Sequence, residues 1–279
     1  MKKLFGSLLV SLLSLHSIAL AEEAKKTLIV GIVPQFEART LHAIWRPILD
    51  ELEVKSGYKF KIRGSGNIPK FEAELSAGRF DLAYMNPYHL VIANEYAGYI
   101  PLVKDSGRSL YGVLVVKKDS DITSPKQLEG KTLAFPAPNA LGASLQMRQE
   151  LEDNFGIKFK TNFVKTHGSV YLNVLLDEAA AGGGVQKTLS RQKPEYRDHL
   201  RIIHKTNEVA PHPIAILPTI DPEVREHIQK ALLEMGESEK GKELLSKIPI
   251  NEIGLASMDD YLPIKELGLD RFYIAPIQQ

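Results

Sequence analysis

The sequence predicts an α/β fold in which largely parallel strands are covered by helices on both faces. Two patterns support this prediction. Short apolar runs rich in β-branched residues alternate with longer segments whose apolar residues recur at helical spacing. Polar residues and prolines typical of helix starts follow several of the strands. The 279 residues, 44% hydrophobic and 25% charged, are enough for two lobes or one large domain.

The N-terminal half reads as successive strand and helix units. Thr27 to Val33 is an apolar strand, and residues 38–55 have apolar side chains at helical spacing. Pro47 inside this helix predicts a kink or a restart. The next strands are expected at 59–63 and 81–85, and the next helices at 69–77 and 87–96.

A new α/β unit begins with the apolar strand Leu110 to Val116, followed by a capped turn from Ser124 to Gly130. Gly182-Gly183-Gly184 lacks the Lys-Ser/Thr of a phosphate loop and indicates close backbone packing or a hinge. Further strands are expected at 132–135, 162–165, 182–185, 201–204 and 213–217. Further helices are expected at 142–154, 169–178, 222–235 and 237–248, with a helical tail from 258.

The first 21 residues have the layout of a cleavable secretory signal. Lys2 and Lys3 precede an apolar run that is short for a bilayer span and interrupted by serines, and Ala19-Leu20-Ala21 stands before Glu22. We predict cleavage after Ala21 and no direct membrane insertion afterwards. Because the chain has no cysteine, we expect no disulfide, no thiolate site and no lipoprotein anchor.

Net charge gives no reason to expect nucleic acid or an anionic membrane as a partner. Cleavage removes two lysines and no acids, which changes the formal charge from +1 to about −1. Catalytic motifs are also missing, since there is no Gly-x-Ser-x-Gly, Walker, Gly-x-Gly-x-x-Gly or His-Glu-x-x-His pattern. His199, His204 and His212 are too irregularly spaced to indicate a metal site. We expect no enzyme activity, no cofactor and no metal.

The join after the strand at 81–85 is the strongest candidate for a binding site. Asn86 suits a helix cap and Pro87 suits the first helical position. Tyr84 and Asn86 would then lie at a carboxyl strand end beside the free N–H groups of a helix, where open α/β sheets bind anions. An ordinary capped turn with a core tyrosine explains these residues equally well.

Two later joins have the same polar character. Residues 135–144 lead from a strand into a helix start, where Asn139, Ser144 and backbone N–H groups can meet a ligand. Simple capping also explains Asn139. His167 starts the next helix and can donate to an anion, although a buried interdomain histidine is the alternative. Together the three joins suit a small oxyanion held by neutral dipoles.

Three motifs follow the signal in a specific order: Phe80-Asp-Leu-Ala-Tyr-Met-Asn-Pro-Tyr88, Ser124-Pro-Lys-Gln-Leu-Glu-Gly-Lys-Thr-Leu-Ala-Phe135, and Thr166-His167. Over nearly all of the mature chain, they resemble the PhnD-like family of phosphate, phosphite and phosphonate binding proteins that feed ABC importers. The resemblance implies the type II periplasmic-binding fold, with two α/β lobes, a ligand cleft and two crossover strands. It implies lobe one at 22–109 plus 213–279, lobe two at 110–212, and hinges near 109–113 and 206–212.

In that family a tyrosine, helix-start hydroxyls and a histidine hold the anion, and Tyr84 and His167 match the first and last. Asn139-Ala140-Leu141 stands where phosphonate binders often carry Ser-Thr-Ser, so backbone N–H groups would replace the hydroxyls. Near His212, binders of aminoalkyl phosphonates carry an acid, and a histidine would not pair with an ammonium.

The resemblance implies a periplasmic solute-binding component of an ABC importer. It would close its two lobes on a small phosphonate-like, phosphite-like or phosphate-like oxyanion and deliver it to a membrane permease. A solute-sensing subunit for a membrane receptor and an enzyme on the same fold are the alternatives. We expect a monomer, because no apolar heptads indicate a partner helix. The ligand-binding residues are expected to be Tyr84, Asn86, Asn139, Ala140, Ser144, His167, Ser169 and His212.

Overall fold

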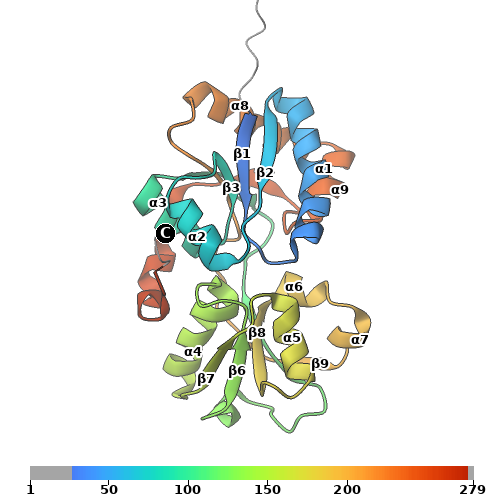
Figure 1. The fold of residues 1–279 in the computed structure, drawn as a ribbon, viewed down its shortest axis with the longest axis vertical. Helices are drawn as coiled ribbons and strands as arrows, with labels where there is room; N and C mark the ends of the chain where they lie inside the picture. The colour runs from blue at the N-terminus through green and yellow to red at the C-terminus, as the bar shows by residue number, and fades with distance from the viewer. Residues whose placement is uncertain (1–26, 276–279) are drawn as a thin grey trace, which may run out of the picture.

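The computed structural model describes residues 27–275, so the signal predicted at 1–21 lies outside the described residues. Two β-sheets, each flanked by helices, form two bodies stacked along the long axis of the molecule (Figure 1). The α/β prediction is confirmed. We call the body that contains the N-terminal strand the first body and the other the second body.

The sheet of the first body is mixed, with the order β11-β4-β10-β3-β1-β2. β1 is parallel to β2 and β3, whereas β10 is antiparallel to β3 and β4, and β11 is antiparallel to β4. The expectation of a largely parallel sheet is therefore wrong here, because β10 returns from the second body and runs back beside β3. Its strands are β1 (Thr27–Ile32), β2 (Lys59–Arg63), β3 (Leu82–Tyr84), β4 (Ile100–Asp105), β10 (Ile214–Ile216) and β11 (Ile253–Leu255).

Helices cover both faces of this sheet (Figure 1). On one face lie α1 (Ala38–Ser56), α8 (Pro222–Met235) and α9 (Glu239–Ser246), which pack on one another; on the other lie α2 (Ile68–Ser76) and α3 (Pro87–Ala97). α1 runs through Pro47 without the restart that the sequence suggested. Apolar residues before and after this proline, including Trp45 and Leu49, are buried in one core, which keeps both halves in a single helix.

The sheet of the second body has the order β7-β6-β8-β5-β9 and is also mixed: β6 is parallel to β7 and β8, and β5 is antiparallel to β8 and β9. Its strands are β5 (Gly112–Lys117), β6 (Thr132–Phe135), β7 (Lys160–Phe163), β8 (Ala181–Val185) and β9 (Leu200–Lys205). Its helical elements are η1 (Pro125–Leu128), η2 (Leu141–Leu145), α4 (Gln146–Phe155), α5 (His167–Leu175), α6 (Gln186–Ser190) and α7 (Pro194–Arg197).

The alternation of side chains along β5 explains why helices pack on both faces of the second sheet. Leu114 and Val116 share an apolar cluster with residues of α4, whereas Val113 and Val115 share one with residues of α5. Glycines in β8 let neighbouring side chains and backbone approach closely. A Cβ on Gly183 would lie 2.0 Å from the carbonyl oxygen of Ala143. The three glycines therefore serve close packing.

Two connectors join the bodies, one between β4 and β5 and the other between β9 and β10. They pair with each other, because Leu110 and Val209 exchange two backbone hydrogen bonds, each of 2.9 Å.

The C-terminal segment contacts both bodies. It consists of the 3₁₀ turns η3 (Met258–Asp260), η4 (Leu262–Leu267) and η5 (Leu269–Phe272), and η4 packs against α3 (Figure 1). Asn139, in the loop before η2, donates to the Ile274 carbonyl at 2.7 Å and accepts from the Ile274 N–H at 3.0 Å. Arg148 of α4 donates to the Phe272 carbonyl at 3.1 Å.

Candidate functional site

Tyr84 ends the β3 strand, between β1 and β10, at the edge of the first sheet that faces the second body. Its ring packs against Trp45 of α1 and stacks on His212 of the returning connector, with ring centroids 5.0 and 5.3 Å apart. The side chain is buried, yet its hydroxyl makes no hydrogen bond to any group within residues 27–275. Burial raises the pKa of Tyr84 far above its usual value, so the hydroxyl is protonated and can donate.

Asn86 caps α3 as the sequence predicts, because its Oδ1 accepts from the His89 N–H at 2.8 Å. Its Nδ2 donates to the carbonyl of Asn139 at 3.2 Å and lies 2.9 Å from His89 Nε2. Glu72 Oε1 lies 2.8 Å from the same ring nitrogen, and Glu72 Oε2 accepts from Asn139 at 2.9 Å. This buried network joins the first body to the loop that precedes η2.

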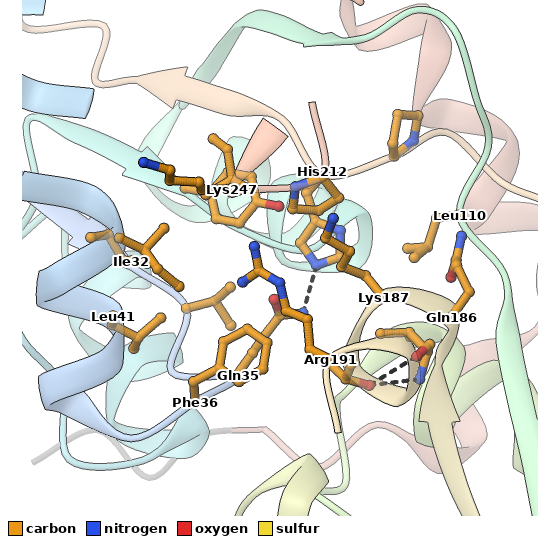
Figure 2. A pocket seen from close by; sticks show the side chains of 18 of the residues that line it. Ile32, Gln35, Phe36, Leu41, Leu110, Gln186, Lys187, Arg191, His212 and Lys247 are labelled. Atoms are coloured by element: carbon orange, nitrogen blue, oxygen red, sulfur yellow. Dashed lines mark hydrogen bonds between the residues drawn. The ribbon is translucent and has the colours of Figure 1, made fainter. Parts of the chain in front are cut away.

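His167 and His212 are both buried beside the space between the bodies. His167 is the first residue of α5, and its Nδ1 lies 3.3 Å from the hydroxyl of Thr188. His212 Nε2 lies 3.1 Å from Gln35 Nε2 (Figure 2). Burial lowers the pKa of His167 to about 4. Burial, together with the positive charges that His89 and His167 would carry, lowers the pKa of His212 to about 3. Both rings are neutral at pH 7 and can hydrogen-bond without adding charge.

Two adjoining compartments lie between the bodies. The helix-end compartment contains residues from the starts of α3, η2 and α5. The first N–H groups of a helix have no partner within the helix, so they can serve an anion. This compartment is lined by Ile68, Asn86, Ala140, Leu141, Gly142, Ala143 and His167, together with five residues that it shares with its neighbour: Val33, Gln35, Leu110, Val185 and His212.

The basic compartment is wider and is named for its four cationic side chains, of which Lys187, Arg191 and Lys247 are labelled in Figure 2. Its walls are apolar and aromatic, formed by side chains of β1, α1 and the segment after α9, and Tyr84 also lines it. The cationic side chains are Arg108, Lys187, Arg191 and Lys247. The cavity volumes are about 40 Å³ for the basic compartment and about 20 Å³ for the helix-end compartment. A single water needs about 10–15 Å³ by this measure, so the space suits a small solute.

Of the residues expected to bind a ligand, five line these compartments: Tyr84, Asn86, Ala140, His167 and His212. The other three have side chains occupied elsewhere. Asn139 bonds to Glu72 and the C-terminal segment; Ser144 Oγ accepts from Arg148 at 3.2 Å; Ser169 Oγ lies 2.9 Å from the hydroxyl of Thr166.

The sequence analysis missed the basic side chains and Gln35. Arg108 follows β4, Lys187 lies in α6, Arg191 follows α6, and Lys247 follows α9, so they come from distant segments with no shared motif. Each looks in the sequence like an ordinary surface charge. Acids near them in the sequence, such as Asp105 before Arg108 and Glu243 before Lys247, add to this impression. Within residues 27–275 no acidic side chain lines either compartment. In the same part of the chain, no helix is long and apolar enough to cross a membrane.

Two mixed α/β bodies, paired connectors and a small anion-compatible space between the bodies define a type II periplasmic binding protein. The fold also matches that of solved proteins. PhnD1 from Prochlorococcus marinus (MIT 9301), in complex with methylphosphonate, aligns with a TM-score of 0.81 and 17% identity over 89% of this chain and 99% of that one. A binding protein component of an ABC phosphonate transporter from Pseudomonas aeruginosa aligns with a TM-score of 0.77 and 17% identity over 89% and 88% of the two chains.

The family model for the periplasmic substrate-binding protein of ABC phosphonate transporters matches residues 30–261. The chain therefore belongs to this family, and the resemblance inferred from the motifs is confirmed. The phosphonates-binding periplasmic protein of Escherichia coli (strain K12) is 23% identical over 273 residues, which cover 93% of this chain and 81% of that protein. Members of the family are periplasmic substrate-binding proteins that work with an ABC permease, and they are not enzymes.

Proposed function

We propose that the protein binds a phosphonate-like anion between its two bodies and delivers it to an ABC permease. The observation that carries this proposal is the Tyr84 hydroxyl, a buried donor with no hydrogen-bond partner within residues 27–275. Burying an unpaired hydroxyl costs about 1–3 kcal/mol. A ligand oxyanion that accepts from Tyr84 would remove this penalty and add a charge-assisted hydrogen bond.

The anion would be held mainly by neutral groups. Tyr84 and Asn86 would contact it from the first body, and His167 and the N–H groups of 141–143 from the second, with His212 between them. Backbone N–H groups would take the place of the hydroxyls that many phosphonate binders carry at the start of η2. Preorganised dipoles of this kind stabilise an anion without the desolvation penalty of a buried cation.

Binding would be coupled to closure of the bodies about the connectors. We propose lobe one as 22–109 plus 213–279, lobe two as 110–212, and hinges near 109–113 and 206–212. A ligand that contacts both lobes stabilises the closed form only by its additional contacts in that form. We further propose that the chain is exported by a signal cleaved after Ala21 and acts as a monomer.

Isothermal titration of the mature protein with methylphosphonate, phosphite and phosphate tests the proposal. We expect saturable binding of at least one of these anions, and weaker binding by Tyr84→Phe and His167→Ala. His227→Ala is the matched control, because His227 is an exposed residue of α8. Unchanged affinity in both site variants would reject the site. Failure of all phosphorus anions to bind the wild-type protein would reject the ligand class.

A further inference from the structure

The basic compartment has more positive charge than a ligand with one anionic group requires. Lys187 and Arg191 extend from α6 and the residues just after it toward the space that His212 and Gln35 also face (Figure 2). Arg108 reaches the same compartment from the connector after β4. The three cations therefore come from two separate segments of the chain and meet at one cavity.

Only one of these three cations has a carboxylate partner within residues 27–275. Arg108 Nε is paired with Asp105 at 3.0 Å. Lys187 donates only a long hydrogen bond, of 3.4 Å, to a backbone carbonyl, and the guanidinium of Arg191 lies 5.5 Å from the ring centroid of Phe36. The compartment therefore carries two uncompensated positive charges.

A buried donor at the basic compartment also lacks a hydrogen-bond acceptor within residues 27–275. One terminal guanidinium nitrogen of Arg108, Nη2, is buried and has no hydrogen-bond partner in the described part of the chain. Burial, followed by repulsion from Arg191 and Arg108, lowers the pKa of Lys187. Cations that repel one another in a partly buried site are stabilised when an anion lies between them.

The basic compartment adjoins the helix-end compartment. His212 and Gln35 line both, so one ligand can extend from the neutral donors at the helix starts to the cations beyond. Much of the wall of the basic compartment is apolar, with Trp45 and Ile44 of α1 among its residues. A short hydrocarbon linker suits this wall, while an ammonium group would meet only cations and neutral groups.

We propose that the solute is an organophosphonate with a second anionic group, such as a carboxylate, at the far end of a short apolar linker. The phosphonate lies where the two compartments meet, between the helix starts and Tyr84, and the second anionic group is bound by Arg108, Lys187 and Arg191. This inference rests on the proposed function and specifies its substrate class. It also excludes aminoalkyl phosphonates as the preferred solutes.

Isothermal titration with three phosphonates of similar length tests this inference. Phosphonopropionate has a second anionic group, propylphosphonate has none, and aminoethylphosphonate has a cationic group. Because hydrogen bonds to charged groups contribute about 1.5–3 kcal/mol, we expect phosphonopropionate to bind about 10-fold or more tightly than propylphosphonate. Aminoethylphosphonate is expected to bind more weakly than both.

Variants that remove one positive charge test whether Lys187 and Arg191 bind the second anionic group. In Lys187→Met and Arg191→Met, the affinity ratio of phosphonopropionate to propylphosphonate should fall toward one. Lys193→Met is the matched control, because Lys193 lies close in sequence but its side chain is 71% exposed, and it should keep the wild-type ratio. If propylphosphonate binds and phosphonopropionate binds no more tightly, the inference is wrong while the proposed function stands. If no phosphonate binds, the inference is wrong, and the proposed ligand class is rejected as well only if phosphite and phosphate also fail to bind.

Discussion

Replacing Tyr84 with phenylalanine should change stability and binding in opposite directions. The substitution removes a buried hydroxyl that has no protein partner in the described residues and keeps the ring that packs on Trp45 and His212. Relief of an unpaired buried hydroxyl is worth about 1–3 kcal/mol. The ligand-free variant should therefore be more stable than wild type, with a melting temperature higher by about 2–6 °C. Loss of a hydrogen bond to a charged ligand should weaken binding about 10-fold to 100-fold.

Tyr99→Phe is the matched control for this prediction. Tyr99 is equally buried, but its hydroxyl donates to the carbonyl of Phe80 at 2.6 Å. This variant should lose about 1–2 kcal/mol of stability, because it breaks that bond and leaves a buried carbonyl unpaired. Urea unfolding of ligand-free protein, checked by native mass spectrometry, measures both variants, and titration with methylphosphonate measures binding. If Tyr84→Phe is destabilised as much as Tyr99→Phe and binds as wild type does, the reasoning is refuted.

Three further predictions concern stability. As pH falls from about 6.5 toward 4, the unfolded chain takes up a proton at His167 that the folded protein resists. This histidine should therefore lower the free energy of unfolding by up to about 3 kcal/mol, in addition to the effect of His212. His167→Gln should remove its share of the difference in urea unfolding between pH 7 and pH 4.5. Gly183→Ala places a Cβ 2.0 Å from the Ala143 carbonyl oxygen and should lower the free energy of unfolding by about 3 kcal/mol. In the control Gly64→Ala the new Cβ meets nothing within 4 Å, so stability should hardly change. Equal melting temperatures of the two variants would contradict this prediction. Asn139→Leu removes a donor from the buried Glu72 carboxylate and both bonds to the Ile274 backbone, and it should cost about 2 kcal/mol, which chemical denaturation would reveal.

The fold class followed from periodicity, but several elements did not. β4 contains Pro101 beside a bulge in its pairing with β10, so it lacks a clean alternating pattern. β11 and the helices α6 and α7 span only three to five residues, too few for a period to be visible. The direction of β10 could not be predicted either, because it depends on where the chain returns from the second body.

The candidate site was predictable where a local motif positions it. Tyr84, Asn86 and His167 each stand at a strand end or helix start, and the structure places all three at the compartments. Asn139 shows the limit of this reasoning, since its side chain is directed to a segment 135 residues away. The same limit applies to Arg108 and Arg191, because only the packing of the two bodies brings these side chains to one cavity.

The C-terminal segment is a further attachment between the bodies, separate from the paired connectors. Before the bodies can separate, the Asn139 bonds to Ile274, the Arg148 bond to Phe272 and the ion pair between Arg271 and Asp153 must break. Each such bond adds about 1 kcal/mol to the barrier if it is lost in the transition state for opening. In the proposed closure mechanism, how long a solute stays bound, and how readily it is released to the permease, is therefore governed in part by residues that never touch it.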